Sequence, residues 1–356
     1  MSPVKPAVIR KRFPPADPPQ PRDRKAEHIR LALDPALRPA RNHFDDYRFE
    51  HRALPEVDFD RIDVTCEFLG HRLAAPILIS CMTGGTKEAT RINRNLASAA
   101  EACGIAVGVG SQRKAIEDPA TEDTFRIRPV APSVPILANL GAVQLNYGFG
   151  ARECRRAVEM IDADALVLHL NPLQEAIQPE GQRNFAGLLG KITAVARELE
   201  FPVIVKEVGC GISREVAEQL LLAGVRILDT AGAGGTSWAR IEAARADDAE
   251  RGDRFAEWGI PTPVAIRRLR GLPGLTIIGS GGVRHGVDAA KAIASGADLV
   301  GVAHRFLQAA DRSGKEVVDL VRRFVEELKT TMFCVGARSL AELRRAPLHP
   351  AGADLE

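Results

Sequence analysis

The sequence predicts an α/β fold in the form of a closed (β/α)8 TIM barrel, with an N-terminal arm or lid and additional C-terminal helices. Eight short apolar runs recur along the chain and are almost continuously hydrophobic, as strands buried on both faces should be. Most gaps between the runs carry a helical pattern, and this alternation favours parallel pairing of the strands. Eight such units within about 230 residues fit a closed barrel better than a doubly wound sheet. The runs are Pro76–Cys81, Ile105–Val109, Val134–Ala138, Ala165–Leu170, Val203–Lys206, Val225–Asp229, Leu275–Ile278 and Asp298–Val302.

Apolar residues at helical spacing identify the segments that should cover the barrel. Two such faces lie in the gaps between runs, and a third follows the last run and predicts a final amphipathic helix. The three sets are Ile92, Leu96, Ala99 and Cys103; Val287, Ala290, Ile293 and Ala294; and Val317, Leu320, Val321, Phe324 and Leu328.

The N-terminal part of the chain differs in composition from the barrel. Residues 1–23 contain seven prolines and predict a disordered or extended arm. A charged segment then begins at Arg24, and the irregular stretch after it has a strand-like piece at Ile62–Thr65. We therefore expect four parts: the arm, residues 1–23; a substrate-binding segment and lid, residues 24–75; the barrel, residues 76–310; and a C-terminal helical extension, residues 311–356.

Composition argues against several classes of protein. The formal net charge is +2 over 356 residues and only 5% of the residues are aromatic, so we expect no nucleic-acid partner and no membrane-surface binding. None of the six cysteines forms a CxxC pair, which favours buried, reduced thiols over a zinc or redox motif. The N-terminus lacks an apolar signal region and no apolar run reaches about 18 residues, so the sequence predicts a cytoplasmic protein.

The candidate site consists of the residues that follow each run, because the active site of a (β/α)8 barrel lies at the carboxyl ends of its strands. Polar or glycine residues occur at all eight of these positions, although ordinary polar loops are the alternative explanation. They are Met82-Thr83-Gly84-Gly85-Thr86, Gly110-Ser111-Gln112-Arg113-Lys114, Asn139, His169 to Glu175, Lys206-Glu207, Gly232 to Thr236, Gly281-Gly282 and Ala303-His304.

Some of these residues indicate a flavin phosphate cofactor. Two glycine turns in the last three units, including Gly279–Gly286, can hold a phosphate monoester through backbone N–H groups. Lys206 can stabilise negative charge on a flavin ring or bind a phosphate directly, and a solvated strand-end lysine is the alternative. Thr83, Ser111 and Asn139 can hydrogen-bond the polar edge of an isoalloxazine ring, although such residues often serve turns.

A second group of residues indicates a diphosphate and a metal ion. Arg113 and Lys114 lie beside Ser111 at the end of one predicted strand. Glu175 offers an oxygen ligand for Mg²⁺, which takes one or two carboxylates and completes its shell with water and substrate phosphate. Three more candidates on the N-terminal segment can reach over the barrel mouth, with a solvated charge cluster as the alternative: Arg24, Lys25 and His28.

Together these motifs resemble one family, the type 2, FMN-dependent isopentenyl-diphosphate isomerases. The resemblance runs in order across roughly residues 23–345. The motif after the fourth run is specific to this family, whereas the Gly-Gly-Val-Arg loop is shared by many FMN barrels. The matching motifs are Arg24-Lys25 with Glu27-His28, Met82-Thr83-Gly84-Gly85, Gly110-Ser111-Gln112-Arg113, His169-Leu170-Asn171-Pro172-Leu173-Gln174-Glu175, Gly234-Gly235-Thr236-Ser237-Trp238 and Gly281-Gly282.

The resemblance implies an isomerase that interconverts isopentenyl and dimethylallyl diphosphate with FMN and Mg²⁺. In that family the flavin is first reduced, normally by NADPH. Reduced flavin then protonates the alkene carbon, and a second proton leaves from the other side of the resulting tertiary cation. An electron-rich flavin suits this chemistry, because it stabilises a cation in an apolar pocket.

The resemblance also implies a role for each matching residue. The catalytic residues would be Gln174, beside the reacting carbons, and His169. Glu175 would hold Mg²⁺, and Ala231 departs from the hydroxyl residue of many members, which puts one hydrogen bond to FMN in doubt. Substrate would be bound by Arg24, Lys25, His28, Ser111, Gln112, Arg113, His169, Asn171 and Gln174. FMN would be bound by Met82, Thr83, Gly84, Ser111, Asn139, Lys206 and Thr236, with its phosphate on Gly281, Gly282, Ala303 and His304.

Two other functions fit the same scaffold. An FMN-dependent 2-hydroxy-acid oxidase or dehydrogenase shares the barrel and the Gly-Gly-Val-Arg loop, but segment 230–240 lacks the histidine that would act as base. A non-catalytic flavin- or phosphate-binding regulator is the other alternative, since fold alone does not determine function. The sequence leaves the oligomeric state open, and barrels of this kind suggest a homo-oligomer, a tetramer or an octamer.

Overall fold

The computed structural model describes residues 24–34, 37 and 41–352. The predicted arm, residues 1–23, lies outside these described residues.

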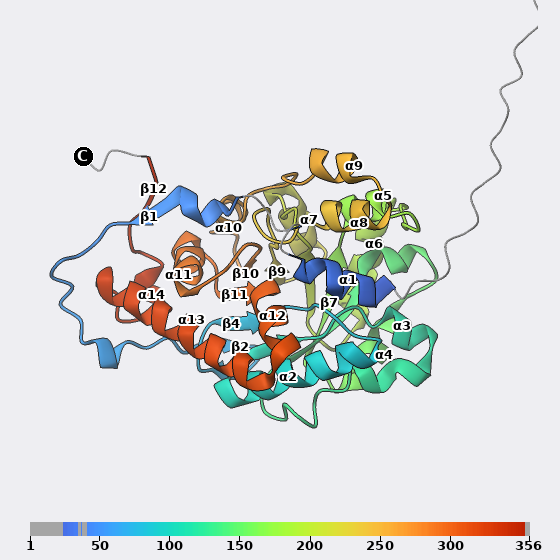
Figure 1. Cartoon of the computed structure of the whole chain (residues 1–356), viewed down its shortest axis with the longest axis horizontal. Coiled ribbons are helices and arrows are strands. Elements are labelled where there is room, and N and C mark those ends of the chain that lie inside the picture. Colours follow the sequence, from blue (N-terminus) through green and yellow to red (C-terminus); the bar gives the residue numbers. More distant parts are fainter. Residues whose placement is uncertain (1–23, 35–36, 38–40, 353–356) are drawn as a thin grey trace, which may run out of the picture.

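A closed barrel of eight parallel strands forms the centre of the molecule, and it confirms the predicted fold class (Figure 1). Each of the eight apolar runs overlaps one strand, and each strand pairs in parallel with its neighbours on both sides. The ring closes through β11 and β4, where Val300 lies opposite Ile77. In chain order the strands are β4 (Ile77–Ile79), β5 (Ala106–Gly108), β6 (Ile136–Gly141), β7 (Ala165–Leu170), β8 (Val203–Glu207), β9 (Ile227–Asp229), β10 (Thr276–Ser280) and β11 (Leu299–Val302).

Helices connect the strands and surround the barrel (Figure 1). No helix in the described part of the chain combines the length and apolar character needed to cross a membrane. The helices after each strand are α2 (Lys87–Cys103); α3 (Arg113–Glu117) and η4 (Pro119–Thr124); η5 (Ala142–Asn146) and α4 (Ala151–Ile161); α5 (Pro172–Ile177) and α6 (Leu188–Glu198); α7 (Arg214–Leu222); α8 (Trp238–Arg245), α9 (Ala249–Arg254) and α10 (Thr262–Leu269); α11 (Gly286–Ser295); and α12 (His304–Arg312), α13 (Gly314–Cys334) and α14 (Leu340–Leu343).

Local sequence explains where these helices begin and end, and α2 is an example. The Thr86 side chain accepts a hydrogen bond from the Ala89 N–H and so caps the first turn. Gly104 ends the helix in the left-handed conformation, with φ of 62°. The predicted apolar face of α2 is confirmed, because Ile92, Leu96 and Ala99 are all buried.

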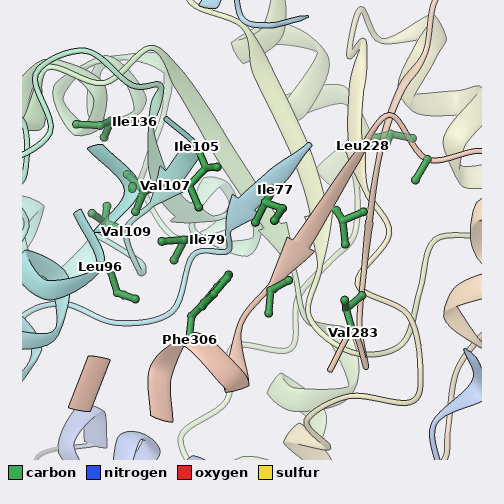
Figure 2. Close-up of a cluster of buried hydrophobic side chains, with 14 of the residues drawn as sticks. Ile77, Ile79, Leu96, Ile105, Val107, Val109, Ile136, Leu228, Val283 and Phe306 are labelled. Carbon is green, nitrogen blue, oxygen red and sulfur yellow. The ribbon is translucent and has the colours of Figure 1, made fainter. Parts of the chain in front are cut away.

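Two apolar layers arise from the alternation of side chains along each strand. Ile77 and Ile79 point outward and pack between the strands and the helices, where Leu96 of α2 and Phe306 of α12 meet them (Figure 2). Leu78 points the other way, into the barrel, with inward residues of the other strands. Burial on both faces explains why the strands read as continuous apolar runs.

A hairpin before the barrel packs against the interior core. It is formed by β2 (Cys66–Phe68) and β3 (His71–Leu73), which pair antiparallel. Phe68 and Leu73 are buried against the interior cluster, which includes the first residues of several strands, Ala106, Ala165 and Leu299 among them. The hairpin therefore closes the end of the barrel at which the strands begin. The predicted strand at Ile62–Thr65 is wrong, since only Asp63 makes an isolated bridge, to Ser339.

The N-terminal and C-terminal segments of the described chain meet on the outside of the barrel. Strand β1 (Tyr47–Phe49) pairs antiparallel with β12 (Leu348–Pro350). The Arg267 guanidinium lies 4.3 Å from the centre of the Tyr47 ring and donates a hydrogen bond to the Leu348 carbonyl. The remaining short elements of this region are α1 (Arg24–Leu33), η2 (His43–Asp46) and η3 (Phe59–Arg61).

We expect Phe68→Ala to lower the free energy of unfolding by about 3–5 kcal/mol, because it opens a cavity between the hairpin and the barrel interior. Urea denaturation measures this change. Leu54→Ala is the matched control, since Leu54 is 77% exposed and its truncation should leave the stability nearly unchanged. Equal effects of the two substitutions would contradict a sealing role for the hairpin.

Candidate active site

A cavity of about 570 Å³ opens at the carboxyl ends of the barrel strands. This volume lies within the range of roughly 300–1,000 Å³ that is usual for small-molecule and cofactor sites. Most of the residues predicted from the sequence line it. They are Lys25, His28, Met82, Thr83, Ser111, Arg113, Asn139, His169, Asn171, Gln174, Glu175, Lys206, Thr236, Gly281, Gly282, Ala303 and His304.

The residues that follow β10, here called the cradle loop (residues 281–284), fit a phosphate group. Gly281 and Gly282 have φ of 104° and 77°, a conformation that favours glycine. A side chain on Gly282 would come within 2.5 Å of the Gly234 carbonyl oxygen, and one on Gly281 would overlap Gly232. Helix α11 begins directly after the loop, so its positive end supports an anion there.

Two polar groups in the wall also fit an FMN molecule. The Ser80 hydroxyl lines the cavity and is buried, with no hydrogen-bond partner among the described residues. Lys206 is 8% exposed, and its ammonium group lies 3.4 Å from Asp229 Oδ2 and donates to the Glu207 carbonyl. Asp229 also accepts a hydrogen bond from the Ser280 hydroxyl. These contacts hold the Lys206 side chain in place at the cavity surface, where it can stabilise negative charge on a flavin.

Glu207 fixes the backbone next to Lys206. Its Oε2 accepts hydrogen bonds from the N–H groups of Val208, Gly209 and Cys210. Burial raises the pKa of Glu207 from its usual value of 4.5 to about 7, because removal from water outweighs the three N–H donors and the nearby lysine. A large fraction of Glu207 is therefore protonated in the folded protein near neutral pH.

Asn139 and His169 meet at the ends of β6 and β7. The His169 Nδ1 atom donates to Asn139 Oδ1 at 2.9 Å, since an amide oxygen can only accept. The bond fixes the orientation of the imidazole at the cavity wall, with its Nε2 edge close to Gly141.

Two residues predicted from the sequence, Gln112 and Gly84, do not line the cavity. Gln112 is fully buried: its Nε2 donates to the Ala157 carbonyl, and its Oε1 accepts from the Asn139 N–H. Its side chain therefore braces the end of β6, and a substrate has no access to it. Gly84 faces the Phe125 ring, which a Cβ atom would overlap. Arg24 begins α1, but its side chain lies outside the described part of the structure.

Helix α1 lies between α12 and α8 and brings residues of the N-terminal segment over the cavity (Figure 1). Lys25 donates a hydrogen bond from Nζ to the Ser111 carbonyl at 2.8 Å. His28 packs edge-on against Trp238, with the ring centres 5.1 Å apart. The expectation that this segment reaches the barrel mouth is confirmed for Lys25 and His28, which both line the cavity.

A buried carboxylate, Glu242, joins α1 to the catalytic candidate Gln174. Glu242 lies 2.9 Å from His28 Nε2, accepts from Gln174 Nε2 at 2.7 Å, and pairs with Arg245 at 2.6 Å. Burial alone would raise the pKa of Glu242, but its hydrogen bonds and ion pairs outweigh burial and the pKa is lowered. The Gln174 amide is therefore held from one side by a carboxylate that stays charged.

The Glu175 carboxylate is held by three hydrogen bonds. Its Oε1 accepts from Asn171 Nδ2 at 3.0 Å, and its Oε2 accepts from Gln178 Nε2 and from the Gln182 N–H. The Asn171 Oδ1 atom is buried without a hydrogen-bond partner among the described residues. A carboxylate beside an unpaired amide oxygen suits a hard cation. No cluster of three or more His, Cys, Asp or Glu ligands occurs in residues 24–34, 37 and 41–352, so water and substrate oxygens would complete such a site.

Gln182 connects this carboxylate to the diphosphate candidate Arg113. Its backbone N–H contacts Glu175, while its side-chain oxygen accepts from Arg113 at 3.1 Å and from Gln144 at 2.6 Å. No motif in the sequence points to Gln182, because it lies in a polar loop far from Arg113 in the chain. Ser80, Gln144 and Trp238 also line the cavity without having been predicted individually as binding residues.

The cysteine that lines the cavity, Cys81, does not add a thiolate to the site. All six are free, and Cys154 alone is fully buried while the other five are partly buried. Cys81 lines the cavity, and burial raises its pKa to about 11, so it carries a neutral thiol at physiological pH.

The barrel, the cradle loop and the buried lysine define a protein of the FMN-dependent class. The sequence model of the family described as FMN-dependent dehydrogenase matches residues 33–129 and 173–350. Among solved structures, a mandelate oxidase variant with 2-hydroxy-phenylacetamide is 18% identical, with a TM-score of 0.63 over 92% of this chain and 98% of that chain. An (S)-mandelate dehydrogenase mutant is also 18% identical, with a TM-score of 0.61 over 91% of each chain. At such identities the two structures support the fold alone.

Sequence relatives narrow the assignment. An isopentenyl-diphosphate delta-isomerase of Nostoc sp. is 50% identical over 337 residues, which cover 93% of this chain and 96% of the relative. The enzymes of that name from Synechococcus sp. and Stutzerimonas stutzeri are 51% and 50% identical; they cover 90% and 91% of this chain, and 94% and 96% of their own lengths. The chain belongs to the isopentenyl-diphosphate delta-isomerase family, within the FMN-dependent barrel class.

The raised pKa of Glu207 predicts a pH-dependent stability. Because the folded pKa is above the unfolded one, the stabilisation is complete below pH 4.5 and is lost as the pH rises through about 7. We expect the free energy of unfolding to fall by roughly 3 kcal/mol at most over this range, and Glu207→Gln to remove that part of the slope.

Urea denaturation between pH 5 and 8 tests this expectation, with the exposed Glu200→Gln as control. Parallel pH profiles of wild type and Glu207→Gln would show that Glu207 does not titrate in this range.

Proposed function

We propose that this protein interconverts isopentenyl diphosphate and dimethylallyl diphosphate, with FMN and Mg²⁺ as its cofactors. The observation that carries the proposal is the composition of one cavity. The cradle loop lies on one wall, and Arg113, Gln174 and Glu175 lie on the same cavity's surface. Three relatives with 50%, 51% and 50% sequence identity to this chain are named isopentenyl-diphosphate delta-isomerase, which supports the same reaction.

The isomerisation moves a double bond by one position without net oxidation. One carbon of the alkene gains a proton, a tertiary cation forms, and a neighbouring carbon loses a proton to give the new alkene. FMN held by the cradle loop and Lys206 would, when reduced, supply an electron-rich ring to stabilise positive charge and acid–base capacity for the proton. The protein must hold the alkene in place and exclude water, which would trap the cation.

Gln174 and His169 are the residues that we place beside the reacting carbons. Glu242 and Asn171 hold the Gln174 amide from two sides, and Asn139 holds the His169 ring. These bonds restrict both side chains to one orientation, so little conformational freedom is lost when substrate binds.

The diphosphate group would be bound by cationic and polar residues from two elements. Lys25 reaches the cavity from α1, and Arg113 reaches it from α3, beside Ser111. An arginine fork and a lysine together suit a diphosphate, because the guanidinium binds two oxygens while the ammonium acts as a point charge.

Glu175 is the protein ligand that we assign to Mg²⁺, with Asn171 Oδ1 as a nearby oxygen. A single carboxylate is enough for this role, because magnesium keeps water and phosphate oxygens in its shell. NADPH as the reductant rests on the family resemblance, the tetrameric or octameric state on the assembly of similar barrels, and the cytoplasmic location on composition. All three are predictions.

The oxidase alternative is not favoured. The loop that follows β9 contains glycines and small residues and brings no imidazole to the cavity between Thr230 and Arg240. Removal of a proton from a 2-hydroxy acid needs a base at that place in such enzymes, so the comparison with the mandelate enzymes extends to the fold only.

We expect the purified full-length protein to be yellow and to convert isopentenyl diphosphate only when Mg²⁺ and a flavin reductant such as NADPH or dithionite are present. The assay follows the formation of dimethylallyl diphosphate under anaerobic conditions. Omission of Mg²⁺ and of reductant gives two controls. Undiminished conversion by flavin-free protein would falsify the proposal.

Glu175→Gln should raise the Mg²⁺ concentration needed for half-maximal rate by tenfold or more, because a neutral amide binds Mg²⁺ far more weakly than a carboxylate. The flavin absorbance should be unchanged, which also shows that the variant folds. Glu200→Gln serves as control, since Glu200 is exposed and does not line the cavity. Loss of the yellow colour in Glu175→Gln would instead assign Glu175 to the flavin.

A further inference from the structure

A buried asparagine before the barrel contacts the cradle loop, although 240 residues separate the two in the chain. Asn42 Nδ2 donates to the Gly282 carbonyl at 2.7 Å and to Asp288 Oδ2 at 3.1 Å. Its Oδ1 accepts from the Phe44 N–H at 3.0 Å. Asn42 is 6% exposed and Asp288 is fully buried, so water does not substitute for these bonds.

The orientation of the Asn42 amide follows from its partners. The Gly282 carbonyl and the Asp288 carboxylate can only accept hydrogen bonds, and the Phe44 N–H can only donate one. Both donor positions of Nδ2 therefore face the cradle loop and α11, and the amide oxygen faces η2. Asparagine meets this requirement, whereas an aspartate would place negative charge against two acceptors.

The contact with Gly282 sets the direction of a peptide group in the cradle loop. Because a trans peptide directs its C=O and N–H to opposite sides, the Val283 N–H points away from Asn42. Val283 lines the cavity, and no described residue accepts a hydrogen bond from the N–H groups of Gly282 or Val283. These donors are the ones that an anion in the cradle would use.

The loop needs such a brace because glycine does not fix its own backbone. Gly281 and Gly282 both lie at positive φ, where glycine moves readily between several conformations. Asp288 holds the next part of the loop, since its Oδ2 also accepts from the Arg284 N–H and Nε. Asn42 thus completes a set of bonds around Asp288 that joins the loop, α11 and the N-terminal segment.

We propose that Asn42 is a positioning residue for the cradle loop, and that it raises the affinity of the protein for the phosphate monoester of FMN. Asn42 also lines the cavity, but its Nδ2 and Oδ1 atoms are bound to Gly282, Asp288 and the Phe44 N–H, so it acts through the Gly282 peptide and Asp288. The proposal rests on the FMN-binding part of the proposed function and is independent of which substrate the enzyme converts.

Two substitutions separate this role from a general effect on folding. In Asn42→Ser the serine hydroxyl can still cap η2 by accepting from the Phe44 N–H, but the side chain is too short to reach Gly282. Asn42→Asp keeps the shape and replaces both donors by acceptors. Lys291→Met is the matched control, because Lys291 donates to the Phe44 carbonyl and fastens the same turn to α11 without touching the cradle loop.

The experiment uses the full-length chain, stripped of flavin and titrated with FMN, with binding followed by quenching of flavin fluorescence. We expect both Asn42 variants to raise the Kd for FMN by about tenfold or more, since a buried acceptor loses its donor. Lys291→Met should change the Kd by less than about threefold. The melting temperatures of the flavin-free proteins are measured alongside, and those of wild type and Asn42→Ser should agree within a few degrees.

Wild-type FMN affinity in Asn42→Ser would overturn the proposal, as would equal losses in Asn42→Ser and Lys291→Met. A fall in the melting temperature that matches the loss of affinity would assign a purely structural role and overturn it as well. Absence of isomerase activity in the wild type would contradict the proposed reaction but would leave these affinities, and the inference, unaffected.

Discussion

The close approach of two glycine loops at the end of the barrel is the constraint on which the candidate site depends. A Cβ atom on Gly235 would come within 2.6 Å of the Gly282 nitrogen, and one on Gly282 would come within 2.5 Å of the Gly234 carbonyl oxygen. Side chains at these positions would force the loops apart and cover the backbone N–H groups. Glycine therefore provides two properties at once: tight packing of β9 and β10 loops, and an accessible backbone for an anion.

Because glycine does not fix its own backbone, the loops need hydrogen bonds from residues outside them to keep one conformation. Asn42 and Asp288 bind one face of the cradle loop, and the Thr262 hydroxyl contacts the Gly281 carbonyl at 2.7 Å. The same principle applies across the cavity, where Glu242 and Gln182 hold Gln174 and Arg113. Gln174, Arg113 and the cradle loop are thus oriented by hydrogen bonds before any ligand arrives, which lowers the entropic cost of binding.

Much of the fold and the site was predictable because it depends on local pattern. Strands buried on both faces must be apolar throughout, so all eight could be identified from runs such as Val203–Lys206. Residues at the carboxyl ends of these strands must then meet at one mouth, which is why Lys206, His169 and Glu175 were found together. The strand Cys66–Phe68 is not predictable in this way, because a three-residue strand with a single apolar contact face carries little periodicity.

Sequence by itself determined the barrel, the place of the site and the family, because these follow from strand order and from motifs that are contiguous in the chain. Tertiary structure decided which residues of those motifs face the cavity. Gln112 lies between two cavity residues, Ser111 and Arg113, yet its side chain turns inward to brace β6. It also decided the long-range partners, Asn42 with Gly282 and Glu242 with His28, because a polar contact between residues more than two hundred positions apart leaves no local pattern. Only the closure of the barrel brings such residues within reach.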